Sequence, residues 1–369
     1  MHLPSAITLD PDLQRVATTL MACPTAPYHE QQTRAAMRSL VEGLSHTTVQ
    51  EDIYGNTLVH YRRNPEPGHA FSLVAHLDHP GFVVCTVQGK RNAQFLGGMH
   101  LRYFEGKEVI FYNTDGPEAL GSARIVRAEA AKGHTKVFFD AEPPRHARFG
   151  MWDLPPFRIT STRCRGRAFD DLAGCASMIA LLRRLARNRA EADVCCLFTR
   201  AEEVGFHGAL ASLKGSLKLP KGPVLSIETS NAQGFAKLGA GPILRVGDRA
   251  TIFTPAVTAW LELALADLGR LQTRFPYQRL LMGGGTCEGT VFQQAGFPTG
   301  AMCLALQNFH NMGPGSNVAA EALSVQDWQM LHEFLFYLAT VASPCHTAHS
   351  TELCQRLKDL QEDALKKLI

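Results

Sequence analysis

Apolar residues recur along the chain with two periods, one typical of helices and the other of strands. Apolar positions three or four residues apart predict helices over 11–23, 30–44, 324–342 and 349–368, and a long apolar helix ending near residue 185. Shorter continuous apolar runs predict buried strands over 71–77, 194–198, 222–229 and 300–305, and residues 53–61 resemble a turn that leads into a strand. This mixture predicts an α/β domain.

Residues 84–157 have a different character. Short strand-like segments at 83–87, 108–112, 123–127 and 136–140 are separated by Gly, Asn and Asp turns, and proline pairs follow at 143–144 and 155–156. Regular short strands without a helical period predict a small β-barrel or sandwich. We therefore expect two domains, an α/β domain formed by 1–83 and 158–369 and an inserted β domain formed by 84–157.

Composition narrows the class of protein. With 369 residues, 45% hydrophobic and 19% charged, the chain has enough apolar material for a large and a small domain. A net charge of +3 is too small to suggest a nucleic-acid or membrane surface, and no apolar run reaches the roughly 20 residues of a membrane span. No signal peptide is visible at the N-terminus and the ten cysteines are scattered, so we expect a soluble cytoplasmic protein without a disulfide framework.

Side chains able to bind metal occur where predicted strands of the α/β part end. Each has an ordinary explanation by itself, such as a helix cap for Asp170 or a solvated pair for the adjacent Glu202 and Glu203. Their common placement favours one site, because ligands of open α/β sheets bind at the carboxyl ends of strands. Five candidate ligands share this placement: His76, Asp170, Glu203, Glu228 and His310.

Two histidines and three carboxylates suit two divalent ions of the zinc or cobalt kind, one carboxylate bridging them. Glu202, next to one ligand, would then be free to act as a general base. Asp78 follows His76 by two residues and would orient its imidazole. The glycine-rich turn before Thr286 is neither a phosphate-binding loop nor a dinucleotide fingerprint, and we expect Gly285 and Thr286 to contact substrate.

The order of these motifs resembles that of the glutamyl/deblocking aminopeptidases of the tetrahedral-particle (TET) type, which are co-catalytic dinuclear metallo-aminopeptidases. The resemblance spans roughly residues 13–341, including the β-rich insertion. It implies a phosphorylase/hydrolase-like mixed sheet flanked by helices, with an inserted small β-barrel. The matching segments are 75–78 (Ala-His-Leu-Asp), 169–171 (Phe-Asp-Asp), 198–199 with 202–205, 208–209, 284–286 (Gly-Gly-Thr) and His310.

The resemblance also implies roles for single residues. Asp170 would bridge two ions, Zn²⁺ most naturally and Co²⁺ or Mn²⁺ as alternatives. Glu202 would take a proton from the bridging water and pass it to the leaving amine. A cis peptide bond is implied between Asp170 and Asp171. His76 and Glu228 would complete the coordination of one ion, and Glu203 and His310 would complete that of the other.

Three positions depart from the family pattern. Glu228 stands where the family usually has Asp, Cys287-Glu288 replace the usual Asp-Ala, and residues 307–311 read Gln-Asn-Phe-His-Asn where Arg-Tyr-x-His-Ser is usual. The last two changes lie where the substrate's side chain or N-terminus would be held. Glu288 therefore joins the candidate substrate-binding residues, and specificity is not copied from the family.

We thus expect a metal-dependent aminopeptidase that removes N-terminal residues from peptides. Two alternatives remain: a deacylase of N-acyl amino acids with the same metal centre, and a metal-binding scaffold without catalysis. The free Glu202 argues against a scaffold, which needs ligands but no base. The expected partners are a peptide substrate and further copies of the chain, as dimers built through the β insertion or twelve-subunit shells, and neither nucleic acid nor a membrane.

Overall fold

An eight-stranded mixed sheet forms the centre of the computed structural model, which describes residues 8–87, 89–232, 234–272, 275–345 and 356–361. Its four inner strands run parallel and are buried almost throughout, as the continuous apolar runs predicted. The strand order is β1 (Thr47–Glu51), β2 (Thr57–Arg63), β12 (Ala192–Thr199), β3 (Phe71–His76), β13 (Val224–Asn231), β16 (Thr299–Leu306), β14 (Ile243–Gly247) and β15 (Gln278–Leu281).

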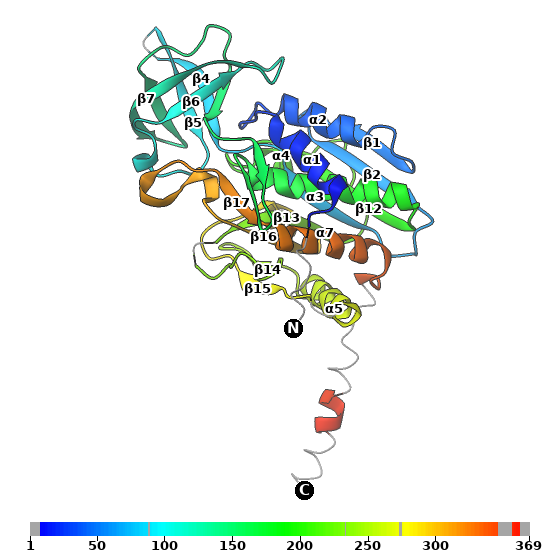
Figure 1. Cartoon of the computed structure of the whole chain (residues 1–369). Helices are drawn as coiled ribbons and strands as arrows, with labels where there is room; N and C mark the ends of the chain where they lie inside the picture. Colours follow the sequence, from blue (N-terminus) through cyan, green and yellow to red (C-terminus); the bar gives the residue numbers. More distant parts are fainter. Residues whose placement is uncertain (1–7, 88, 233, 273–274, 346–355, 362–369) are drawn as a thin grey trace.

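Helices cover both faces of this sheet (Figure 1). Successive strand residues point to opposite faces, so Cys196 and Cys195 pack into two different apolar clusters. One face packs against α1 (Pro11–Ala22), α2 (Gln31–Val41), α3 (Phe169–Asn188), α5 (Pro255–Leu271) and α7 (Val325–Thr340), and the other against α4 (His207–Ser212) and α6 (Glu288–Gln294).

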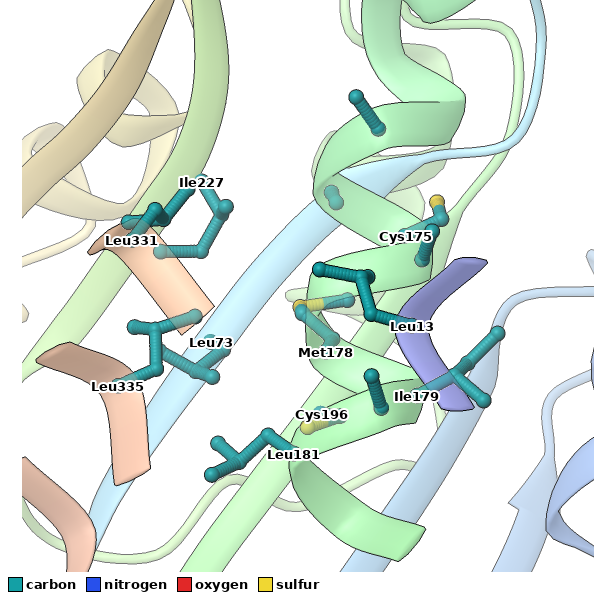
Figure 2. Close-up of a cluster of buried hydrophobic side chains, with 14 of the residues drawn as sticks. Leu13, Leu73, Cys175, Met178, Ile179, Leu181, Cys196, Ile227, Leu331 and Leu335 are labelled. Carbon is teal, nitrogen blue, oxygen red and sulfur yellow. The ribbon is translucent and has the colours of Figure 1, made fainter. Parts of the chain in front are cut away.

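Helix α3 is the centre of the larger cluster. Figure 2 shows Met178 and Leu181 of α3 between Leu13 of α1 and the side chains of the sheet and α7. Helix α1 begins where the Asp10 side chain accepts hydrogen bonds from the N–H groups of Asp12 and Leu13, with proline as its first residue. Because α3 is apolar on every side, it has to be enclosed in this way.

The inserted β region closes into a barrel, which lies at one end of the α/β layers (Figure 1). Phe82, Phe95, Phe104 and Trp152 fill it with edge-to-face and tilted ring contacts. The strands follow the order β4 (Gly81–Val87), β5 (Lys90–Leu96), β8 (His134–Phe139), β7 (Ala119–Ala131), β6 (Glu108–Tyr112) and β9 (Phe149–Trp152). Of the two predicted alternatives, the structure has the barrel and not the sandwich. The domain boundaries at 84 and 157 stay predictions.

A small third sheet joins the chain before α3 to the chain after β16. It consists of β10 (Phe157–Ile159), β11 (Arg163–Gly166) and β17 (Glu321–Ser324). Three short 3₁₀ turns complete the fold: η1 (Leu101–Tyr103), η2 (Phe309–Asn311) and η3 (Pro314–Ser316).

Most predicted elements are confirmed. The helices over 11–23, 30–44 and 324–342 correspond to α1, α2 and α7, and the expected strand after the turn at residue 53 is β2. Of the helix predicted over 349–368, only residues 356–361 are described, and they are helical. The sequence analysis gave no element between residues 232 and 282, where the structure has β14, α5 and β15. Within the described residues, no helix is long and apolar enough to cross a membrane.

Truncating a core side chain of α3 tests the packing. Leu181 is fully buried, so Leu181→Ala removes apolar contacts and leaves a cavity. We expect the free energy of unfolding in urea to fall by about 2–5 kcal/mol. Leu271, which is 70% exposed at the end of α5, is the matched control, and Leu271→Ala should change it by less than about 0.5 kcal/mol. Equal losses in the two variants would contradict the described core.

Candidate active site

The candidate ligands converge at the edge where the inner parallel strands end. His76 is the last residue of β3, Glu203 follows β12, Glu228 lies in β13 and His310 follows β16. Asp170 comes to the same edge at the start of α3. A cavity of about 550 Å³ opens there, and all five candidate ligands and Glu202 line it. The sequence prediction that they lie together therefore holds geometrically.

Asp170 lies between the two histidines. Its Oδ1 is 3.6 Å from His76 Nε2, and its Oδ2 is 3.3 Å from His310 Nε2. Donor atoms bound about 2.0–2.1 Å from one tetrahedral ion lie about 3.3 Å apart, so both spacings fit donors that share an ion. The Asp170–Asp171 peptide bond is cis, as the resemblance implied. Asp170 is not the helix cap; Asp171 instead accepts a hydrogen bond from Gly174 N–H.

Both imidazoles present Nε2 to the acidic cluster. His310 donates its Nδ1–H to the Gly98 carbonyl at 2.7 Å, and the His76 Nδ1 lies 3.2 Å from the Asp78 carbonyl. These contacts fix each ring and leave the other nitrogen for a cation. Gly98 follows barrel strand β5, so the inserted barrel takes part in holding a candidate ligand.

The loop with Glu202 and Glu203 is held by buried carboxylates. Asp78 accepts hydrogen bonds from the N–H groups of Glu202 (3.0 Å) and Glu203 (3.2 Å). Glu30 accepts one from Ala201 N–H and pairs with Arg200. Ala201 has φ of 50°, a left-handed conformation that non-glycine residues adopt only when their surroundings enforce it. Asp78 thus positions the loop more directly than it orients His76, whose Nδ1 is 3.5 Å from Asp78 Oδ1.

Buried acids outnumber the basic groups that line the cavity. The side chains of Glu202 and Glu203 are only 11% and 5% exposed, which rules out a solvated pair. Within the described residues, the buried atom Glu228 Oε1 has no hydrogen-bond donor, and Glu203 Oε1 has only His310 Nε2 beside it, at 3.2 Å. Burial, together with neighbouring acids, raises the pKa of Glu228 to about 7. Burial alone would lower the pKa of His76 and His310, but the surrounding carboxylates hold both well above the ordinary value.

Orphaned carboxylate oxygens beside imidazole nitrogens fit a divalent metal, because it supplies the charge these groups lack. Three sets of possible ligand atoms each lie within 4.8 Å of one another: Asp170 with Glu203 and His310, His76 with Asp171 and Glu228, and His76 with Glu202 and Glu203. The first set is one of the two predicted. The second places Asp171, which the sequence analysis did not select, beside the other predicted pair.

Known proteins match both the sequence and the fold. Residues 145–322 match the sequence profile of the M42 glutamyl aminopeptidases. The matched segment covers just under half of the chain. The match supports the family recognised from the motif order, and it agrees with the expected class, hydrolases of peptide bonds. A curated protein of Acetivibrio thermocellus, provisionally named an aminopeptidase, is 28% identical over 151 residues, which are 39% of this chain and 44% of that protein. The chain therefore matches less than half the length of this curated relative.

Solved structures extend the match to the whole fold. The TET aminopeptidase of the marine sediment archaeon Thaumarchaeota archaeon SCGC AB-539-E09 gives a TM-score of 0.74 at 19% identity, covering 89% of this chain and 97% of that one. The TET1 peptidase of Pyrococcus horikoshii gives 0.72 at 19% identity, covering 89% and 99%. The chain thus has the predicted α/β fold with its inserted barrel.

The predicted substrate-binding residues separate into two kinds. Gly285 and Thr286 line the cavity, whereas Glu288 is not among its lining residues. The Glu288 side chain is fully buried and accepts a 2.5 Å hydrogen bond from Thr199 Oγ1. Burial raises its pKa to about 8. The departure at Glu288 therefore lies behind the cavity wall.

Sequence reasoning missed Arg245, a single cation in the apolar strand β14. Arg245 lines the cavity although it is only 1% exposed. Its Nη2 donates to the Thr229 carbonyl and to Ser230 Oγ, while Nε and Nη1 have no hydrogen-bond partner in the described part of the chain. The signal that could have identified Arg245 is a charged residue within an apolar run.

Glu288 makes the stability of the metal-free protein depend on pH. Its pKa is raised in the folded state, so between pH 4.5 and about pH 8 the folded chain holds a proton that the unfolded chain has lost. Stability should fall as pH rises through this window. We expect the thermal midpoint, measured in the presence of chelator, to fall less steeply with rising pH in Glu288→Gln than in the wild type. Exposed Glu105→Gln is the control, and equal slopes for wild type and Glu288→Gln would contradict the burial described.

Proposed function

We propose that the chain is a dinuclear metal-dependent aminopeptidase that hydrolyses N-terminal residues from peptides. The observation that carries the proposal is the position of Asp170, whose two oxygens face two histidines that are otherwise well separated in the sequence. A carboxylate so placed is suited to bridge two ions. The M42 profile match supports the same chemistry.

The ligand assignment is the one that the resemblance implies. Asp170 would be shared, Glu203 and His310, whose Nε2 lies 3.2 Å from Glu203, would hold one ion, and His76 and Glu228 would hold the other. Nitrogen and oxygen donors in this number favour zinc, with cobalt and manganese as alternatives. When bound, the two ions would polarise the peptide carbonyl and acidify a water.

Glu202 is assigned as the general base. It lines the cavity, its Oε2 lies 3.8 Å from His76 Nε2, and its backbone is fixed by Asp78. Burial and the neighbouring acids raise the pKa of Glu202 well above the ordinary value, which suits a carboxylate that must accept a proton from water. Glu202 then donates that proton to the leaving amine.

The cavity wall suggests which N-terminal side chains are accepted. Ile243, Leu280 and Met282 supply an apolar wall for the aliphatic part of a side chain. The guanidinium of Arg245 lies behind it with two unpartnered nitrogens. Its charge favours an acidic end group and opposes a basic one. We therefore propose a preference for acidic over basic N-terminal residues, which is in keeping with the glutamyl aminopeptidase profile.

A homo-oligomer is also part of the proposal. The TET1 peptidase of Pyrococcus horikoshii can assemble into a tetrahedron or a large octahedral shell, and this chain shares its fold over most of its length. Whether this chain forms dimers or twelve-subunit shells depends on surfaces outside the site. The predicted cytoplasmic location stays a prediction.

Replacing Glu202 tests the assigned base. Glu202→Gln keeps size and hydrogen bonding but cannot accept the proton, so we expect kcat on aminoacyl-p-nitroanilides to fall at least about 100-fold with metal content unchanged. Metal content is measured by elemental analysis of the reconstituted protein. Glu203→Gln is the matched comparison, and this variant should lose metal as well as activity.

Other outcomes select the alternatives. Full activity in Glu202→Gln would remove Glu202 from the mechanism. Turnover confined to N-acetylated amino acids would make the protein a deacylase. Failure to turn over either substrate set, with two ions bound, would favour the scaffold.

Replacing Arg245 tests the proposed specificity. Arg245→Met keeps the volume but removes the charge, so the ratio of kcat/KM for glutamyl- over lysyl-p-nitroanilide should fall about tenfold or more, equivalent to about 1.4 kcal/mol. Arg279→Met is the control, because Arg279 is 54% exposed and outside the cavity lining. An unchanged ratio in Arg245→Met would refute the preference and leave the peptidase assignment intact.

A further inference from the structure

Glu321 connects two of the proposed ligands from behind the cavity. It is fully buried at the start of β17. Its Oε2 accepts hydrogen bonds from the N–H groups of Phe169 (2.6 Å) and Asp170 (3.2 Å), and its Oε1 accepts one from His310 N–H (2.9 Å). One carboxylate therefore binds the backbone of both Asp170 and His310, which are far apart in the sequence.

The position of Glu321 is itself fixed on both sides. It pairs with Gly166 of β11, which leads into Asp170. Its neighbour Ala322 exchanges backbone hydrogen bonds with Gln307, which leads into His310. The carboxylate is thus held between the two segments whose N–H groups it accepts.

The segment around His310 needs such a support. Asn308, His310 and Asn311 have φ values of 58°, 55° and 62°. Left-handed conformations at non-glycine residues cost free energy and persist only where the surroundings enforce them. The Glu321 hydrogen bond to His310 N–H enters the middle of this run. It holds the backbone of His310, while the Gly98 carbonyl accepts the Nδ1–H of the ring.

Glu321 has a counterpart across the site. Asp78 accepts the N–H groups of Glu202 and Glu203, so one buried carboxylate holds the loop after β12 and the other holds the start of α3 and the loop after β16. Neither Glu321 nor Asp78 lines the cavity. Both oxygens of Glu321 accept backbone N–H groups, and Glu321 belongs to none of the possible ligand sets found among the described residues.

We propose that Glu321 is a positioning residue that sets the spacing between Asp170 and His310, the ligands that would share one ion with Glu203. The proposal rests on the ligand assignment of the proposed function. It predicts that the amide in Glu321→Gln, which has only one acceptor oxygen, cannot serve three N–H donors. The variant would keep all the ligand side chains but would no longer hold Asp170 and His310 at the right spacing.

The test compares metal-free wild type, Glu321→Gln and Asp327→Asn. Asp327 is also a buried carboxylate that accepts two backbone N–H groups, those of Gly239 and Gly241, but it touches no proposed ligand. Zn²⁺ and Co²⁺ affinities are measured by competition with a chelator. We expect Glu321→Gln to bind one ion about 10- to 100-fold more weakly, and Asp327→Asn to bind both as the wild type does.

Hydrogen exchange of the metal-free proteins tests the positioning without any ion. Amides in 168–171 and 309–311 should exchange faster in Glu321→Gln and at the wild-type rate in Asp327→Asn. If Glu321→Gln does not fold, Glu321→Asp is used instead. We then expect a smaller increase in exchange rate and a smaller loss of metal affinity. Wild-type affinity and exchange in the Glu321 variant, or equal changes in both variants, would overturn the proposal. A wild type that binds both ions but cleaves no peptide would overturn the proposed function alone.

Discussion

Acidic side chains crowd the buried edge where the four inner parallel strands end, and their unbalanced negative charge shapes everything around them. Burying a carboxylate without a partner costs several kcal/mol in general, so each must find donors or cations. The imidazoles of His76 and His310 face the two oxygens of Asp170 and offset part of this cost. The Glu228 oxygen that lacks a donor in the described part of the chain leaves the rest to a cation.

The same constraint explains the buried carboxylates that do not line the cavity. Glu30, Asp78 and Glu321 accept backbone N–H groups from the loops that carry the site. Hydrogen bonds of this kind offset the cost of burial and fix loops that contain left-handed residues such as Ala201 and His310. Rigid strands bring the ligands to one edge, and these carboxylates set their final positions.

The barrel is part of this arrangement. It leaves the sheet immediately after the strand that ends in His76, and its Gly98 carbonyl returns to accept the Nδ1–H of His310. A Cβ at position 98 would lie 3.4 Å from that nitrogen, in ordinary van der Waals contact with the ring. The insertion therefore contributes a backbone acceptor to a site whose ligands all come from the α/β part.

The sequence by itself determined the features that depend on local pattern and motif order. Apolar runs identified the inner strands, and the polar residues at their ends identified His76, Asp170, Glu203, Glu228 and His310, because the ends of parallel strands meet at one edge. The same local reading gave the inserted β domain and the free carboxylate of Glu202. It missed β14 and α5, and with them Arg245, since no motif lies in that region.

Only the tertiary structure decided which groups meet across long separations. Glu321 lies 151 residues from Asp170 and 11 residues from His310, and no spacing rule relates a strand-initial acid to these two backbone N–H groups. Glu288 was expected to contact substrate because it departs from the family pattern where the substrate would be held, yet the helix that begins there turns its carboxylate inward to Thr199. Whether a residue lines the cavity or supports it depends on where its side chain points in the folded core, and its position in the chain does not reveal that direction.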